Sequence, residues 1–149
     1  MIDKILRKIG KITGAEYRQT TYSQAGEDII MELILERLRL SKVSYLDIGT
    51  NHPKKFNNTY FFYKKGHNGV CVEPNPALAK TIKRVRPNDK TLNVGLSSGE
   101  EYTADFFVLS VDTLSTFSKE DAEKLDAEGT FTIKEKIPIE LKNVNNIIA

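Results

Sequence analysis

The sequence has few of the residues on which protein sites are often built. Cys71 is the only cysteine, His52 and His67 are the only histidines in 149 residues, and tryptophan is absent. A single cysteine excludes an intrachain disulfide and a thiolate metal cluster. Because Cys71 stands in the apolar run 69–72, we expect a buried thiol rather than a nucleophile. No metal site is predicted, since two histidines are too few to indicate one.

The chain also lacks an excess of charge of either sign and any long apolar run. Its 22 basic and 20 acidic residues leave a net charge of +2, and no basic block is present, so nucleic acid is not an expected partner. No run approaches the roughly 20 apolar residues of a membrane span. The N-terminus lacks the apolar core of a signal peptide, so a cytoplasmic protein is expected. The length and the 40% apolar fraction fit one globular domain.

The N-terminal residues have a helical pattern of their own. Apolar residues recur at helical spacing, with basic residues mostly opposite: Ile2, Ile5, Leu6, Ile9 and Ile12. We therefore predict an N-terminal helical extension over residues 1–20, followed by the main domain at 21–149. The extension would pack on the domain or on a partner, or alternatively lie on a membrane surface. Its short length and Gly10 favour packing.

Two short apolar runs that carry acids are the most informative feature of the chain. The predicted strand 43–48 contains Asp47 and is followed by Gly49, and the predicted strand 69–73 ends at Glu73. In a nucleotide-binding βαβ unit, the glycine lets the backbone approach the ligand and the second acid binds the ribose hydroxyls. The pattern therefore predicts a site for an adenosine-containing cofactor.

Strand and helix patterns alternate along the chain. Helices are predicted from 27 to about 40, from a cap at Asn57 or Asn58 through Lys65, and over 76–86, and a third strand is predicted over 91–96. Strand and helix in this order predict an α/β fold with a parallel sheet and right-handed crossovers.

The character of the chain changes after Ser97. Alternating residues predict strands over 102–108, with one more polar face, and over 131–141. Ser118 and Asp121 fit a capping-box start for a helix over 119–127, and Asn143 is expected to cap a final helix over 144–149.

Several groups of residues carry a further signal as a set. They are Tyr22-Ser23-Gln24-x-Gly26-Glu27-Asp28, Tyr45-Leu46-Asp47-Ile48-Gly49-x-Asn51-x-Pro53, Asn58-Thr59, Gly69-Val70-x-Val72-Glu73-Pro74-Asn75-Pro76, Arg86-Pro87-x-Asp89 and Leu92-Asn93. Together, over residues 20–149, they resemble FkbM-type methyltransferases. The resemblance implies a Rossmann-like parallel sheet with flanking helices, S-adenosylmethionine as cofactor, and O-methylation of a small-molecule acceptor such as a saccharide.

The resemblance also implies a set of cofactor-binding residues. Asp47 and the backbone around Gly49 would lie near the amino acid part of the cofactor, Glu73 would bind the ribose diol, and Asn75, Asn93 and Val94 would border the adenine. Asn51 and Pro74 are further expected cofactor-binding residues. Gln24, Glu27 and Asp28 would close over the methionine end, and Thr59 would lie near the site. Alternative structural roles are a loop cap for Asp47, an exposed lysine pair for Glu73, dipole complementation for Glu27 and Asp28, and a helix cap for Thr59.

His52 is the candidate catalytic residue. It is the only titratable group near the expected methyl site that could act as a general base at neutral pH. Alternatively, His52 only orders the turn before Pro53. The segments 102–110 and 115–116 are expected on the acceptor side of the site.

Two features depart from the family pattern. Asn51, His52 and Pro53 follow Gly49, where the wider class has a glycine-rich turn. Family members also continue into a strand with an Asp-x-Glu-Gly-like motif, so we expect a C-terminally truncated domain. Its apolar sheet edge would be covered by the C-terminal segment or by another chain, which makes a homo-oligomer a further expectation.

Two other functions compete with methyl transfer. One is a non-catalytic cofactor-binding or interaction module, which a truncated domain favours. The other, less favoured, is an NAD-dependent oxidoreductase, which would need a Gly-x-Gly-x-x-Gly turn, whereas residues 47–56 contain a single glycine.

Overall fold

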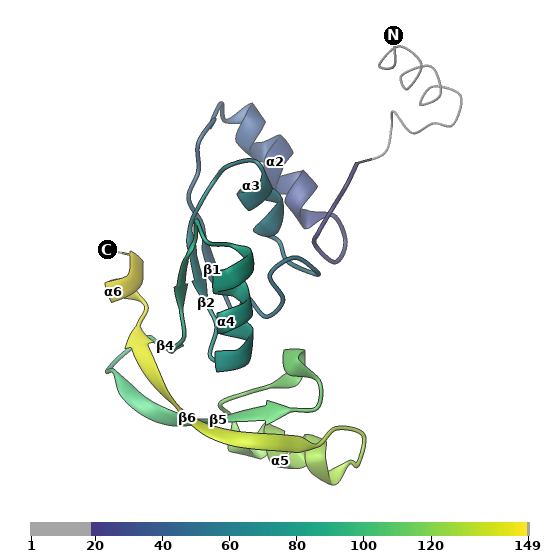
Figure 1. Ribbon diagram of the computed structural model, residues 1–149, viewed down its shortest axis with the longest axis vertical. Coiled ribbons are helices and arrows are strands. Elements are labelled where there is room, and N and C mark those ends of the chain that lie inside the picture. Colours follow the sequence, from purple (N-terminus) through teal and green to yellow (C-terminus); the bar gives the residue numbers. More distant parts are fainter. Residues whose placement is uncertain (1–18, 149) are drawn as a thin grey trace, which may run out of the picture.

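The computed structural model describes residues 19–148 and shows an α/β fold with two small sheets (Figure 1). The elements are α2 (Glu27–Arg37), β1 (Leu46–Ile48), α3 (Tyr60–Lys64), β2 (Val70–Val72), α4 (Pro76–Val85), β3 (Lys90–Leu92), β4 (Gly95–Ser97), β5 (Tyr102–Leu109), η2 (Asp112–Leu114), α5 (Lys119–Ala127), β6 (Ile133–Asn143) and α6 (Asn145–Ile148). The predicted N-terminal extension lies almost wholly outside the described residues.

The first sheet is parallel, in the order β1-β2-β3. Leu46 pairs with Val70, and Val72 with Leu92, so the three strands are in register and end at one edge. The helices α3 and α4 form the two crossovers, which confirms the predicted parallel arrangement. Each strand is shorter than predicted, and β1 lies at an edge of this sheet with Ile48 60% exposed.

The predicted third strand over residues 91–96 is wrong as a single element. The structure divides it into β3 and β4, which belong to different sheets. The side chain of Asn93 donates hydrogen bonds to the carbonyl oxygens of Glu73 (2.8 Å) and Pro74 (2.7 Å). The Asn93 side chain thus occupies the carbonyl group of Glu73, to which a backbone amide would bond if β3 continued alongside β2. The pairing of β2 with β3 therefore ends at this point.

The second sheet has the order β4-β6-β5, with β5 antiparallel to β6. One core cluster contains Phe106, Val108 and Ile139, and another contains Phe107, Leu109 and Ala122 of α5. Residues 106–109 are all buried, so the predicted polar face of this strand is wrong at its C-terminal end. The predicted α5 is confirmed over 119–127, with the Ser118 hydroxyl accepting from the amide of Asp121 (3.1 Å).

The helix α2 ends earlier than predicted and exposes its apolar stripe. Arg39 has a φ of 57°, its amide donates to Glu36, and the amide of Leu40 donates to Leu35, which is a Schellman end. The exposed apolar residues are Ile30, Met31, Leu33, Ile34 and Leu38. Among the described residues, no helix has both the length and the apolar character of a membrane crossing.

Candidate functional site

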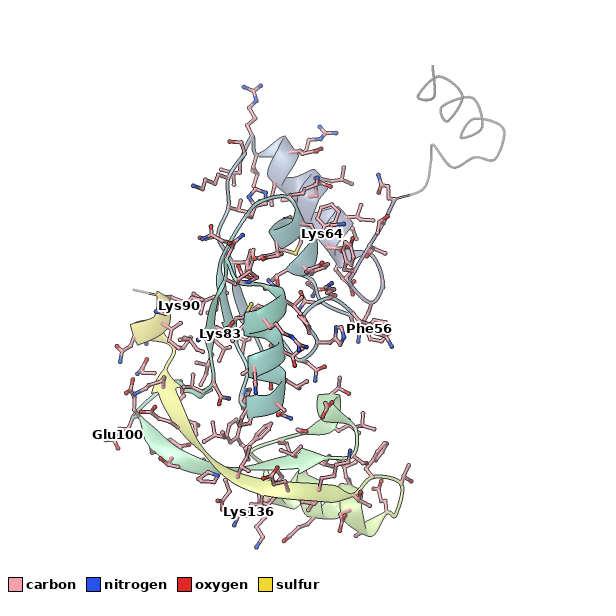
Figure 2. The ribbon with its side chains drawn as sticks, in the orientation of Figure 1. Phe56, Lys64, Lys83, Lys90, Glu100 and Lys136 are labelled. Carbon is pink, nitrogen blue, oxygen red and sulfur yellow. The ribbon has the colours of Figure 1, made fainter. Side chains whose placement is uncertain are left out.

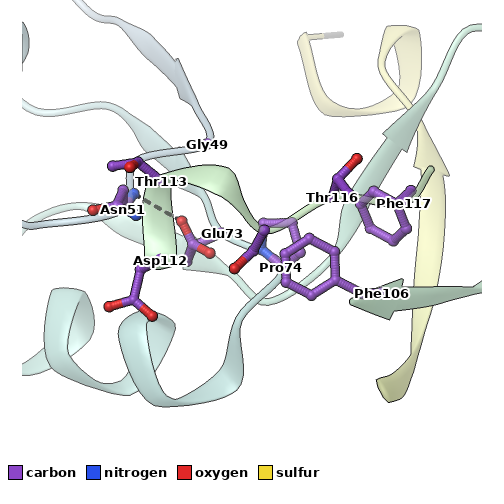
Figure 3. A pocket seen from close by; sticks show the side chains of 10 residues that line it. Gly49, Asn51, Glu73, Pro74, Phe106, Asp112, Thr113, Thr116 and Phe117 are labelled. Carbon is purple, nitrogen blue, oxygen red and sulfur yellow. Dashed lines mark hydrogen bonds between the residues drawn. The ribbon is translucent and has the colours of Figure 1, made fainter. Parts of the chain in front are cut away.

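A cavity of about 430 Å³ lies at the carboxyl ends of β1 and β2 (Figure 3). Its first wall consists of Gly49, Asn51, Glu73 and Pro74, which follow these two strands. Its second wall comes from residues within 106–117. All four residues of the first wall belong to the predicted cofactor-binding set, so the structure brings these four together.

The turn after β1 presents its backbone to the cavity. Gly49 has a φ of 69°, in the left-handed region that favours glycine, and its amide donates to the carbonyl of Val72 (2.9 Å). Apart from its chain neighbours, no heavy atom lies within 4 Å of the position that a Cβ would take at Gly49. Glycine therefore leaves room for a ligand against the backbone.

Glu73 is the buried acid of the first wall. It is 4% exposed, and its carboxylate accepts from the amides of Asn51 (2.7 Å) and Asn75 (2.9 Å). Burial raises the pKa of Glu73 above its ordinary value; the two amide hydrogen bonds oppose this, and the negative charges of Asp112 and Asp47 add to it. The alternative of an exposed lysine pair is wrong. Each carboxylate oxygen can accept one more donor, so Glu73 keeps capacity for a ligand.

The second wall combines two aromatic rings with hydroxyl groups and one acid. The rings of Phe106 and Phe117 have centroids 4.8 Å apart. Ser115 and Thr116 accept from the backbone amides of Leu109 (3.1 Å) and Ser118 (3.0 Å), so their own hydroxyl hydrogens can be donated to a ligand. The wall therefore offers flat apolar surface together with hydrogen-bond donors.

Sequence reasoning missed Asp112, Thr113 and Phe117 of this wall. They come together because Phe107 and Thr116 exchange backbone hydrogen bonds of 2.8 and 3.1 Å, which folds the loop back against β5. The available signal was the serine- and threonine-rich loop that follows a buried strand.

Asp47 does not line the cavity. Its Oδ2 accepts from the Thr59 hydroxyl (2.5 Å) and from Nδ2 of Asn57 (3.0 Å), and it lies 3.6 Å from Nη1 of Arg86. The structure therefore places the carboxylate in a polar cluster between β1, α3 and the end of α4. Thr59 belongs to the same cluster and also lies away from the cavity lining.

Arg86 is the centre of this cluster and is 0% exposed. Its guanidinium donates to Asp89 (2.7 Å), to the Tyr45 hydroxyl (3.1 Å) and to the Thr59 hydroxyl (2.8 Å). Cys71 packs beside Asp89, and burial raises the pKa of its thiol to about 12. The expectation of a buried Cys71 is confirmed, and its thiol stays protonated at neutral pH.

Two of the predicted adenine-side residues, Asn75 and Asn93, contact the first wall without lining the cavity. Oδ1 of Asn75 accepts from the amides of Ala77 (3.0 Å) and Leu78 (3.4 Å), so Asn75 caps α4. Asn93 holds the carbonyl groups of Glu73 and Pro74, and Val94 follows it between β3 and β4. None of Asn75, Asn93 and Val94 lines the cavity itself.

The predicted methionine-side residues order their own turn. Asp28 is buried and accepts from the Thr21 hydroxyl (2.6 Å), the amide of Tyr22 (2.8 Å) and the Ser23 hydroxyl (2.9 Å). Glu27 accepts from the amide of Ala25 (2.8 Å), and Gln24 is exposed in the same turn. The structure does not bring Gln24, Glu27 or Asp28 to the cavity, which favours a local structural role.

His52 lies outside the cavity lining as well. Its Nδ1 accepts from the amides of Lys54 (3.1 Å) and Lys55 (2.8 Å), which favours the alternative that it orders the turn. Of the two predicted cap residues in this loop, Asn57 accepts from the amides of Thr59 and Tyr60 through its Oδ1, while the N-cap position of α3 is Thr59, which makes no side-chain cap hydrogen bond.

The described residues contain no group of three or more His, Cys, Asp or Glu side chains that could hold a metal ion. No family model matches the chain, and the comparisons with curated proteins and with solved structures found no match. The geometry of the cavity and the sequence motifs therefore carry the functional argument.

Proposed function

We propose that the chain is an S-adenosylmethionine-dependent methyltransferase domain that methylates a hydroxyl oxygen of a small molecule such as a saccharide. The observation that carries the proposal is Glu73, a buried carboxylate at the end of β2 with acceptor capacity facing a cavity. Ligands of open parallel sheets bind at the carboxyl ends of the strands, where this cavity lies. The order β1-β2-β3 with its crossover helices agrees with one half of a Rossmann-like sheet, which is part of the proposal.

The residues present fit the cofactor. Glu73 would accept hydrogen bonds from the two ribose hydroxyls, and Gly49 would let the ribose and methionine part approach the backbone. The rings of Phe106 and Phe117 offer apolar surface to a planar base. A volume of about 430 Å³ is within the range of about 300–1,000 Å³ typical of small-molecule sites.

The chain would act on the reaction mainly by orientation. When bound, the cofactor supplies a methyl group already activated on a sulfonium, so the protein has to align the acceptor oxygen and exclude water. Ser115 and Thr116 can donate hydrogen bonds to the molecule that receives the methyl group. Asp112, which lines the cavity, is better placed than His52 to accept the proton of an acceptor hydroxyl.

An NAD-dependent oxidoreductase fits less well. Its pyrophosphate needs the N-terminus of a helix directly after the glycine turn. The helix that follows Gly49 begins only at Tyr60, after a loop that contains no further glycine. A non-catalytic module would bind the same cofactor without turnover, and the exposed apolar stripe of α2 is the feature that favours an interaction role.

Calorimetric titration with S-adenosylhomocysteine and with NAD tests the proposal. We expect binding of S-adenosylhomocysteine, and we expect Glu73→Ala to weaken it roughly 10- to 100-fold, since hydrogen bonds to a charged group contribute about 1.5–3 kcal/mol. Glu120→Ala, which removes an exposed glutamate of α5, is the matched control and should leave the affinity unchanged. An unchanged dissociation constant in Glu73→Ala would remove the ribose role, and tighter binding of NAD would favour the oxidoreductase.

A further inference from the structure

The loop between β1 and α3 holds two non-glycine residues in the left-handed backbone region, which asparagine tolerates and phenylalanine rarely adopts. Asn51 has a φ of 54° and Phe56 a φ of 53°, and a left-handed conformation is rare for a bulky residue. The Phe56 side chain stands at the surface, 59% exposed, so packing of its ring does not hold this conformation (Figure 2). Such conformations persist where the surroundings fix them, and they concentrate at binding sites.

The residue that fixes the loop is Asn57, which is 3% exposed. Its amide donates to the carbonyl of Tyr22 (2.9 Å), and its Nδ2 donates to the carbonyl of Thr50 (3.3 Å). Its Oδ1 accepts from the amides of Thr59 (3.1 Å) and Tyr60 (2.8 Å) and from Nη1 of Arg86 (3.1 Å). Because all three of these groups are donors, the side-chain atom that faces them must be the oxygen. The NH₂ group of Asn57 therefore faces the carbonyl of Thr50 and the carboxylate of Asp47, which are acceptors.

One peptide group connects Asn57 to the cavity. The carbonyl of Thr50 and the amide of Asn51 belong to the same planar unit. Asn57 holds the carbonyl end of this unit, and the amide end donates to Oε2 of Glu73 at 2.7 Å. A rotation of the peptide plane would therefore break both hydrogen bonds together.

We propose that Asn57 is a positioning residue of the cofactor cavity, which fixes the Thr50–Asn51 peptide so that its N–H holds the carboxylate of Glu73. Arg86 supports this role by holding the other end of the Asn57 amide. The importance of Glu73 for a ligand rests on the proposed function, whereas the link from Asn57 to Glu73 rests on the hydrogen bonds alone.

The test compares Asn57→Ala with Asn58→Ala, since Asn58 is the exposed neighbour. The readouts are the amide proton shift of Asn51 in ¹H–¹⁵N spectra and calorimetry with S-adenosylhomocysteine, on protein that circular dichroism shows to be folded. In the wild type the short hydrogen bond to a carboxylate should place the Asn51 amide proton downfield. In Asn57→Ala we expect this signal to move upfield and the affinity to fall roughly tenfold. A tenfold change in affinity corresponds to the loss of about one hydrogen bond to a charged group. Asn58→Ala should match the wild type.

Two further variants separate positioning from loss of stability. Thr59→Val removes hydroxyl contacts to Asp47, to Arg86 and to Oδ1 of Asn57 but leaves the contact between Nδ2 of Asn57 and Thr50. It should lower the melting temperature without moving the Asn51 signal. Should Asn57→Ala not fold, Asn57→Asp keeps the acceptor toward Arg86 and removes the Nδ2 donor toward Thr50 and toward Asp47.

The outcomes distinguish the two proposals. An Asn51 signal that stays in place in the Asn57 variants, or that moves equally in Thr59→Val, overturns the positioning role. A signal that moves only in the Asn57 variants, in a protein that binds no S-adenosylhomocysteine, supports the positioning role and rejects the cofactor.

Discussion

Two carboxylates at the ends of neighbouring strands have different partners. Asp47 contacts Arg86, Asn57 and Thr59 and contributes to the buried cluster. Glu73 contacts only backbone amides among its described hydrogen bonds and keeps acceptor capacity toward the cavity. Of these two acidic side chains, Asp47 inside β1 thus contributes to the buried cluster, and Glu73 directly after β2 contributes to the site.

The pH dependence of binding should reflect Glu73. Burial raises the pKa of Glu73 above its ordinary value of 4.5, with the charges of Asp112 and Asp47 adding to the shift, and only the ionised form could accept from both hydroxyls of the proposed ribose. We expect the affinity for S-adenosylhomocysteine to fall on acidification, and to do so at a higher pH than an ordinary glutamate would cause. Calorimetry on the wild type and on Glu73→Gln checks this, because the variant should lack the dependence. An equal slope in both would assign the titration to another group.

The same shift has a consequence for stability. The folded protein holds the Glu73 proton more tightly than the unfolded chain does. The contribution of Glu73 to the free energy of unfolding is therefore fully present when the pH lies below 4.5, the ordinary pKa of this group. It is lost as the pH rises through the raised pKa of Glu73 in the folded protein.

Residues of the first wall could be predicted from the sequence. Gly49 and Glu73 followed from the strand pattern of a nucleotide-binding unit, whereas Asn51 and Pro74 were predicted from the family resemblance. The direction of Asp47 could not be predicted, since it depends on Arg86, whose burial is set by the packing of the whole sheet.

Among the elements, α4 and α5 begin with a side-chain cap. Asn75 accepts two amides of the first turn of α4, and Ser118 accepts one of α5. These local signals explain why both helices were predicted almost to the residue. The third strand was not, because the division at Asn93 depends on contacts with Glu73 and Pro74 far away in the sequence.

Removal of either cap should cost stability, but only one should affect the site. We expect Asn75→Ala and Ser118→Ala each to lower the free energy of unfolding by about 1 kcal/mol. Asn75→Ala keeps the backbone amide that holds Glu73 but loses the cap that orders the first turn of α4 around it, so this variant should also weaken binding of S-adenosylhomocysteine. Urea denaturation and calorimetry measure the two effects. Equal affinities in both variants would contradict a role for this cap in the site.

At the scale of the molecule, Arg86 joins segments that lie far apart in the chain. It bonds to Tyr45 before β1, to Asn57 and Thr59 before α3, and to Asp89 before β3. The exposed stripe of α2 shows the limit of sequence reasoning at this scale. Its periodicity predicts a helix but does not reveal what covers it.

Arg86→Met should lower the free energy of unfolding by about 3–5 kcal/mol, because it leaves the buried carboxylates without their cation. Arg84→Met removes an exposed arginine of α4 and is the matched control, with little expected effect. Chemical denaturation measures both. A double change, Arg86→Met with Asp89→Leu, should recover part of the loss, and no recovery would argue against uncompensated charge as the cause.

The cavity takes one wall from the parallel sheet and the other from residues around β5. A small molecule bound there would touch both halves of the protein and would act as a clamp between them. The bound ligand would couple the unfolding of the two sheets, because unfolding of either sheet would lose the ligand's contacts. Each sheet would therefore unfold at a higher temperature when the ligand is bound.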